Sequence, residues 1–217
     1  MAVSNVLLLF QATGYVVALI FSLCTVVPLI LNLQCFKGHC LLFTTGTFGD
    51  DANMIPSWAS KGYCIYTLIV GAFLSLVSLV QAIRMFSMLR KEQDSSFLSA
   101  FIDCILTLAL SINVFAVSIL VTVGFKTWCE SLYQRVTSCD DASVMEFINS
   151  DGITTIGFYI HIQTVQFGIW SSWVCCVLLT VLSTLKLCRY HEQEVIRVSM
   201  ARQRQKIINQ CDKEYTD

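Results

Sequence analysis

Long apolar runs alternate with short polar stretches along the chain. Four runs are evident, at about residues 6–31, 64–88, 97–125 and 164–187. Each is long enough to cross a bilayer, because a helix needs roughly 20 apolar residues to span about 30 Å of hydrocarbon. The third run reads FLSAFIDCILTLALSINVFAVSILVTVGF and has polar sequence at both ends. The pattern predicts an all-α membrane protein, a bundle of four transmembrane helices.

The polar stretches set the predicted organisation. Residues 1–190 form a single transmembrane domain with large loops at 32–63 and 126–163, and residues 191–217 form a tail. The tail has segments without a helix breaker, so a helix can continue out of the membrane. Residues 41–48 alternate weakly between apolar and polar side chains and are rich in Thr and Phe, which favours a short strand in the first loop.

Composition agrees with this pattern and narrows the partners. Hydrophobic residues make up 55% of the 217 residues and charged residues 13%, whereas a soluble domain carries about 25% charged residues. The charges gather in short stretches between the apolar runs, as in polytopic membrane proteins. The expected surroundings are therefore a lipid bilayer. The net charge of −1 gives no reason to expect a nucleic-acid partner.

Lysine and arginine counts predict the orientation. Residues 84–96 hold three of these residues and residues 186–217 hold seven, whereas the two large loops hold two each. Because cytoplasmic segments carry the excess of positive charge, both termini are expected in the cytoplasm and both large loops outside. Helices of about 23–26 residues suit a thick bilayer, which favours the plasma membrane over other secretory-pathway membranes.

Aromatic residues gather toward the predicted outer side. Tryptophan and tyrosine are enriched at membrane–water interfaces, so we expect an outer belt that Tyr63 and Tyr66 join. Its tryptophans are Trp58, Trp128, Trp170 and Trp173.

Eleven cysteines divide according to the predicted side of the membrane. Outside or at the outer boundary, where oxidising conditions favour disulfides, lie Cys35, Cys40, Cys64, Cys129 and Cys139. Four cysteines allow three connectivities. We favour Cys40–Cys64, from the first loop to the second helix, and Cys129–Cys139, above the third helix. Cys35 is then free, replaces Cys40 as a partner, or pairs between chains.

Two other cysteine features carry alternative interpretations. Cys35, His39 and Cys40 resemble half of a zinc site, but no second Cys/His pair follows at zinc spacing, so no metal is predicted. Cys188 lies at the predicted cytoplasmic end of the fourth helix, beside Arg189, and is a candidate for palmitoylation. The alternative is an unmodified thiol at the membrane interface.

Few polar side chains interrupt the apolar runs. Asp103 is the one acid among them, and an intramembrane carboxylate is a candidate proton or ion site. It lies about two turns from the cytoplasmic end, so pairing with Arg84 or Arg90 would give it a structural role instead. Asn113 lies nearer the middle of the third run and is expected to hydrogen-bond another helix. Three glutamines are expected to do the same: Gln11, Gln81 and Gln166.

Several motifs resemble one known family. Residues 36–44, FKGHCLLFT, followed by Gly46, are similar to the first-loop motif of the transmembrane protein 179 family. Similar segments occur at 96–101, 123–129, 138–139 and 166–173, so the likeness runs from about Asn5 to Tyr190 and leaves out the tail. It implies four membrane helices and two outer loops with cysteines at the matching positions, Cys40, Cys64, Cys129 and Cys139. The chain departs from the family at Cys35 and at Asp103, and the resemblance carries no catalytic residue.

Two functions compete. The first is a non-enzymatic tetraspan scaffold or auxiliary subunit of a receptor, channel or adhesion complex, which would bind another membrane protein through its outer loops. The alternative is a pore-forming or transport protein that acts as a homo-oligomer. The first is favoured because the first, second and fourth helices show no sustained polar face. No catalytic motif occurs and the three histidines are scattered, so neither an enzyme nor a cofactor is predicted.

Overall fold

The computed structural model describes residues 2–48, 54–91, 97–133, 138–144, 153 and 155–216. Within these residues four long helices, one short 3₁₀ helix and two strands follow one another along the chain. They are α1 (Ala2–Cys35), β1 (Thr45–Phe48), β2 (Met54–Ser57), α2 (Gly62–Lys91), α3 (Phe97–Leu132), η1 (Asp141–Val144) and α4 (Phe158–Thr216).

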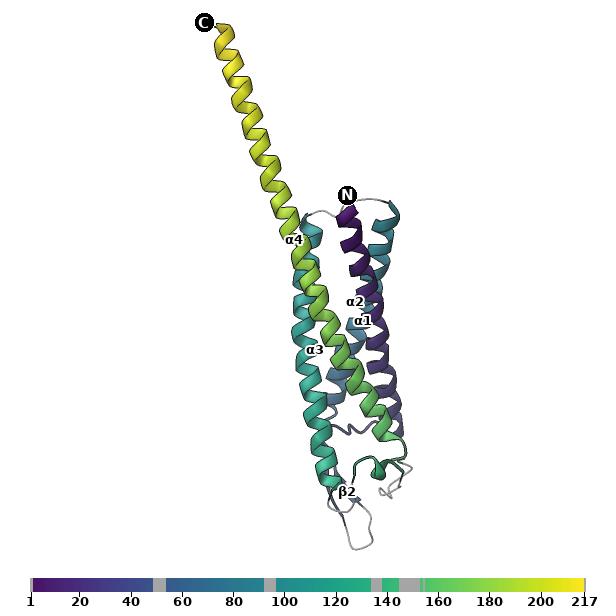
Figure 1. Cartoon of the computed structure of the whole chain (residues 1–217). Helices are drawn as coiled ribbons and strands as arrows, with labels where there is room; N and C mark the ends of the chain where they lie inside the picture. The colour runs from purple at the N-terminus through teal and green to yellow at the C-terminus, as the bar shows by residue number, and fades with distance from the viewer. Residues whose placement is uncertain are drawn as a thin grey trace.

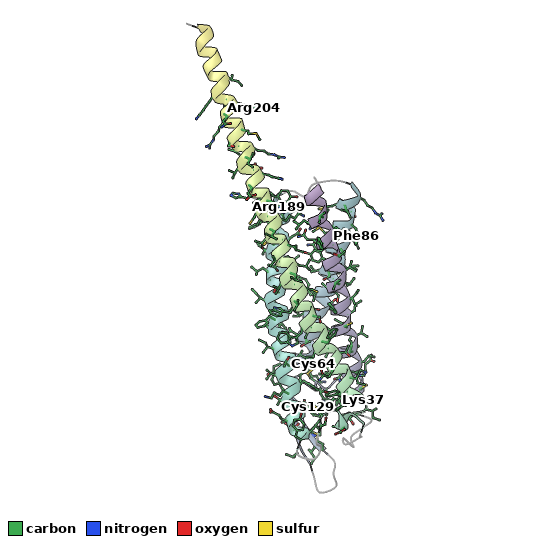
Figure 2. The ribbon with its side chains drawn as sticks, viewed as in Figure 1. Lys37, Cys64, Phe86, Cys129, Arg189 and Arg204 are labelled. Carbon is green, nitrogen blue, oxygen red and sulfur yellow. A yellow bond between two sulfur atoms is a disulfide. The ribbon has the colours of Figure 1, made fainter. Side chains whose placement is uncertain are left out.

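The four long helices lie side by side as an elongated bundle (Figure 1). Both chain termini lie at one end, which we call the termini end, and β2 lies at the other. We call the second end the cap, formed by the described residues 36–48, 54–61, 126–133, 138–144, 153 and 155–157. From about Arg189 to its end at Thr216, α4 leaves the bundle at the termini end and projects alone. Figure 2 labels Arg189 where α4 leaves the bundle and Arg204 on the projecting part.

Each of the four helices contains a span that is long and apolar enough to cross a membrane. The surface of the bundle is apolar as well, since Phe10, Ile69, Ile112 and Phe167 are each at least 60% exposed. In a soluble bundle the outward face would be polar. The predicted four-helix membrane bundle is therefore confirmed.

Small residues bring the helices close together. A Cβ added to Gly71 of α2 would come within 2.9 Å of the Val26 side chain of α1. One turn further along, Ser75 donates a hydrogen bond to Ser22 of α1 at 2.8 Å.

The helices do not contact one another equally. α1 packs against both α2 and α4, and α3 packs mainly against α4, while α2 and α3 touch each other much less. Because α2 and α3 have few contacts, each side chain that bridges these two helices is important for holding them together.

The helices extend beyond the predicted boundaries. α3 continues seven residues past Phe125, and α4 begins at Phe158 rather than at residue 164. Hydropathy marks where the apolar run stops, whereas the helix continues until its backbone is interrupted. The tail is likewise part of α4 up to Thr216, with no break at residue 190. Gly157, with a φ of 78°, adopts the left-handed backbone conformation immediately before α4 begins.

The strand expected at residues 41–48 covers only Thr45–Phe48 and pairs antiparallel with β2. The preceding residues form a turn instead, with Leu41 and Leu42 fully buried and Phe43 at a φ of 63°. Consecutive buried side chains cannot alternate between two faces as a half-buried strand requires. The first half of the strand prediction was therefore wrong.

Candidate functional site

Two disulfides hold the cap to the ends of the helices. Cys40 is bonded to Cys64 and Cys129 to Cys139, with Cα–Cα distances of 5.7 and 5.4 Å. Figure 2 places the labelled Cys64 and Cys129 at this end of the bundle. Both favoured pairings are confirmed. Cys35 is a free thiol in this single chain and does not replace Cys40 as a partner of Cys64. Its pairing between two chains stays a prediction.

Trp128 fills the centre of the cap. It is fully buried, and its ring makes edge-on contacts with Phe36 at 6.4 Å and Phe158 at 6.1 Å. Its expected place in an outward aromatic belt was therefore wrong. Because α3 continues to Leu132, Trp128 lies in the last turns of this helix, where Phe36 and Phe158, the first residue of α4, pack against its ring.

The other predicted belt residues are divided between packing and exposure. Trp58 stacks on His39 at 4.6 Å, and Trp170 donates a hydrogen bond to Thr122 at 3.1 Å. Trp173 is partly buried and packs against the apolar core. Among the predicted belt residues, Tyr63 and Tyr66 are the exposed ones, at 40% and 39%.

The first loop folds directly onto α3. The Phe43 amide donates a hydrogen bond to the Gly124 carbonyl at 3.1 Å. A Cβ on Gly124 would approach the Phe43 ring to 2.9 Å, closer than carbon atoms normally come. Thr44 closes the turn, because its hydroxyl donates to the Cys40 carbonyl at 2.6 Å and accepts from the Ala59 amide at 3.3 Å. The cap is therefore ordered by main-chain contacts as well as by disulfides.

A buried ion pair lies within the bundle toward the termini end. Arg84 of α2 contacts Asp103 of α3 at 2.7 Å, and the same guanidinium nitrogen reaches Ser99 at 2.6 Å. Gln81 donates to the second carboxylate oxygen of Asp103 at 2.9 Å. Of the two arginines expected near Asp103, Arg84 is the partner. The carboxylate is 3% exposed and the guanidinium side chain 34%, so only the cation has a route to the bundle surface.

This pair belongs to a polar layer contributed by all four helices. Gln11 of α1 donates to Ser183 of α4 at 3.2 Å, and the neighbouring Thr184 contacts Cys104 beside Asp103. Tyr15, one turn from Gln11, is 2% exposed, and its hydroxyl has no hydrogen-bond partner among the described residues. We call the set formed by Gln11, Tyr15, Ser183, Gln81 and the Arg84–Asp103 ion pair the polar layer. Sequence analysis missed Tyr15 and Ser183 because a single tyrosine or serine in an apolar run carries no signal.

Two further polar contacts join helices nearer the cap. Asn113 accepts a hydrogen bond from the Tyr66 hydroxyl at 3.4 Å and donates to the Ala109 carbonyl at 2.8 Å. Thr122 accepts hydrogen bonds from Gln166 and from Trp170, both at 3.1 Å. Unlike Gln11 and Gln81, which are buried, Asn113 is exposed on the surface of the bundle.

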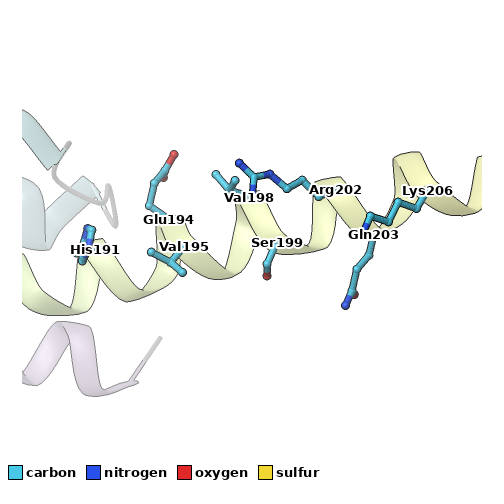
Figure 3. A pocket seen from close by; sticks show the side chains of 8 residues that line it. All are labelled: His191, Glu194, Val195, Val198, Ser199, Arg202, Gln203 and Lys206. Atoms are coloured by element: carbon cyan, nitrogen blue, oxygen red, sulfur yellow. The ribbon is translucent and has the colours of Figure 1, made fainter.

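Two features of the described residues bear on metal and ligand binding. The described residues contain no group of three metal-binding side chains, and Cys40 of the candidate zinc half-site is consumed by its disulfide. A space of about 460 Å³ lies along the projecting part of α4 (Figure 3). Its lining comes from one helix alone: His191, Glu194, Val195, Val198, Ser199, Arg202, Gln203 and Lys206. It is the flank of a helix, without an opposing wall.

Comparison with known proteins fits this architecture. The family model of the transmembrane protein 179/179B claudin domain matches residues 7–208, which include all four spans and both disulfides. The chain belongs to this family. In this claudin-domain chain the family model also matches part of the tail, up to residue 208, whereas the sequence motifs had suggested a limit near Tyr190. A search of solved structures gives no match.

Two residues were expected to distinguish this claudin-domain chain from its family, and the structure gives them different surroundings. Asp103 is paired within the polar layer. Cys35 is a half-buried thiol at the end of α1. Cys188 is exposed where α4 leaves the bundle, and its palmitoylation remains a prediction.

Proposed function

We propose that this claudin-domain protein is a non-enzymatic tetraspan scaffold or auxiliary subunit that binds another membrane protein through its cap. The observation that carries this proposal is that the cap is rigid and yet exposes apolar side chains on its surface. Two disulfides and Trp128 fix the cap, yet Ile55, Tyr133 and Ile156 are 67%, 56% and 56% exposed. Aromatic and apolar side chains on a rigid support are the usual anchors of protein interfaces.

The proposal includes an orientation and a location. The cap faces the cell exterior and both termini face the cytoplasm, at the plasma membrane. One support is the excess of Lys and Arg in residues 84–96 and 186–217, which hold ten against four in the large loops. The other is the presence of both disulfides at the cap, because disulfides persist in oxidising compartments. Epitope tags at the C-terminus and after Ser57 test it, because only the latter should bind antibody on intact cells.

The polar layer supports a structural role rather than transport. Both oxygens of Asp103 accept hydrogen bonds, from Arg84 and Gln81, and the opposite charge of Arg84 offsets that of the carboxylate. Toward the cap, the bundle interior is filled by Val114, Val117 and Ile169, all fully buried. A transport path through one chain would need these side chains to be displaced.

The decisive experiment is quantitative co-purification of the full chain from cells in mild detergent. We expect a membrane protein in stoichiometric yield with the wild type, and its loss with Ile55→Ser. Ile196→Ser is the matched control, since Ile196 is also an open isoleucine, 55% exposed, at the other end of the molecule. Equal recovery with both variants would refute binding through the cap. A homo-oligomer that conducts ions without a partner would refute the auxiliary role.

A further inference from the structure

The outward face of α3 carries a continuous stripe with heptad spacing. Its exposed residues alternate at intervals of four and three positions, the repeat that keeps one seam of two supercoiled helices in contact. We call it the α3 stripe: Leu98, Ile102, Ile105, Ala109, Ile112, Ala116, Ile119, Val123, Lys126 and Glu130.

Lipid contact alone requires only apolar side chains, and the corresponding face of α2 meets that requirement. Its exposed positions at the same spacing are Ile65, Ile69, Ala72, Leu76, Leu79 and Ile83. This α2 face has a single alanine. At the same spacing it continues to Phe86 and ends in the single charge of Arg90. The α3 stripe differs in having two alanines one heptad apart, each between isoleucines, and in ending in a charged pair.

Asn113 makes the difference sharper. It borders the α3 stripe near the middle of the helix and is exposed, whereas Gln11 and Gln81 are buried. Its hydrogen bonds to Ala109 and Tyr66 use one donor and one acceptor site, while an amide offers two N–H donors and two lone pairs. In hydrocarbon the remaining capacity is costly unless another helix supplies partners.

The charged end of the α3 stripe is complementary to itself. Lys126 and Glu130 are 75% and 59% exposed and lie 3.7 Å apart on the same helix face. Each copy of the chain therefore presents one positive and one negative charge at adjacent levels. In a second copy of the same orientation identical residues lie level, so each Lys126 stands about one helical turn from the Glu130 of the other copy. The opposite charges can then meet diagonally across the seam.

We propose that two copies of this chain associate through their α3 stripes, as a parallel pair related by a two-fold axis along the bilayer normal. Copies inserted in the same direction place identical residues at identical depth. Ala109 and Ala116 allow the two α3 backbones to approach, and the isoleucines between them fill the seam. The Asn113 amides border the seam at equal depth, and the Lys126 and Glu130 charges interlock beyond the apolar part. We infer that the partner is a second copy of the chain, because two α3 stripes facing each other match in length, in depth in the membrane and in charge.

The first test measures dimerisation of the full chain in lipid vesicles by resonance energy transfer between labelled copies, over a range of protein-to-lipid ratios. Ala109→Ile combined with Ala116→Ile should raise the dimer dissociation constant at least ten-fold, and Asn113→Leu should raise it several-fold. Ala72→Ile on α2 is the matched control and should have no effect. No energy transfer with the wild type, or equal transfer with all variants, would overturn the proposal.

The second test uses the charges. Lys126→Glu alone leaves only negative charges at this end of the seam and should weaken the pair. Glu130→Lys alone leaves only positive charges there and should weaken it as well. The double exchange of Lys126→Glu with Glu130→Lys restores complementarity and should recover the wild-type dissociation constant. If the double variant is as weak as the single ones, the charges do not meet across the seam and the parallel arrangement is wrong.

A third measurement is independent of how the packing variants fold. Ile112→Cys should form a covalent dimer under mild oxidation in membranes, in excess of the background from native cysteines, and Ile83→Cys on α2 should not. Crosslinking at residue 83 but not at 112 would place the contact on another face. Because no other protein is present in the vesicles, these outcomes are separate from the proposed binding of a membrane partner by the cap.

Discussion

The two ends of the bundle are held together by different chemistry. At the cap, two disulfide bonds join loops to helix ends, and the buried Trp128 adds apolar contacts between them. At the termini end, the helices meet in the polar layer, whose ties are hydrogen bonds and the ion pair of Arg84 with Asp103. The cap should therefore respond to reduction and to changes of side-chain volume. The polar layer should respond to loss of a charge.

The largest effect is expected from breaking the ion pair on its exposed side. Arg84→Met leaves Asp103 buried without its counter-ion, which costs about 3–5 kcal/mol of unfolding free energy for a buried pair. Unfolding in mixed micelles, followed by tryptophan fluorescence, measures the loss. Asp103→Asn should cost less, since the partly exposed arginine left behind can turn toward the interface. Equal losses for the two variants would contradict this asymmetry.

Removal of a disulfide comes next and acts only on the cap. The pair of changes Cys40→Ser and Cys64→Ser should lower the unfolding free energy by about 2–4 kcal/mol, mainly by freeing the unfolded chain. Reducing agent should lower wild-type stability but leave this variant less affected, because only Cys129–Cys139 remains to be reduced. The contact between Arg84 and Asp103 should persist in both. A variant as stable as the oxidised wild type would show that main-chain contacts alone hold the loop.

Gly124→Ala tests the close approach of the first loop to α3. The added methyl group would press on the Phe43 ring, and overpacking of this kind costs about 1–3 kcal/mol. Hydrogen exchange should show faster opening of the Phe43 amide, which donates to the Gly124 carbonyl. Gly62→Ala is the control, because a Cβ at Gly62 has the Ser60 hydroxyl as its nearest neighbour, at 3.3 Å. Equal protection of the Phe43 amide in both variants would argue against a tight fit.

The sequence predicted the membrane architecture more completely than the sites. Hydropathy and charge locate helices well, because a bilayer imposes their length and composition. The cysteine pairings were predictable because only a few cysteines lie near the cap. Trp128 was misassigned for a physical reason: tryptophan is equally suited to a membrane interface and to a covered apolar site, and only the extension of α3 to Leu132 distinguishes them. Tyr15 and Ser183 join the polar layer through helix packing, which no single-sequence pattern specifies.

The smallest effect is expected between the two ends, where a single hydroxyl receives two hydrogen bonds. Thr122 of α3 accepts from Gln166 and Trp170 of α4. Thr122→Val keeps the shape but removes the acceptor, at a cost of about 0.6 kcal/mol per bond in a membrane bundle. Thr122→Ser keeps the hydroxyl and should stay close to the wild type in mixed-micelle unfolding. A serine variant as weak as the valine variant would assign the loss to the missing methyl group, and the α3–α4 contact would then depend on packing there, as it does at the cap.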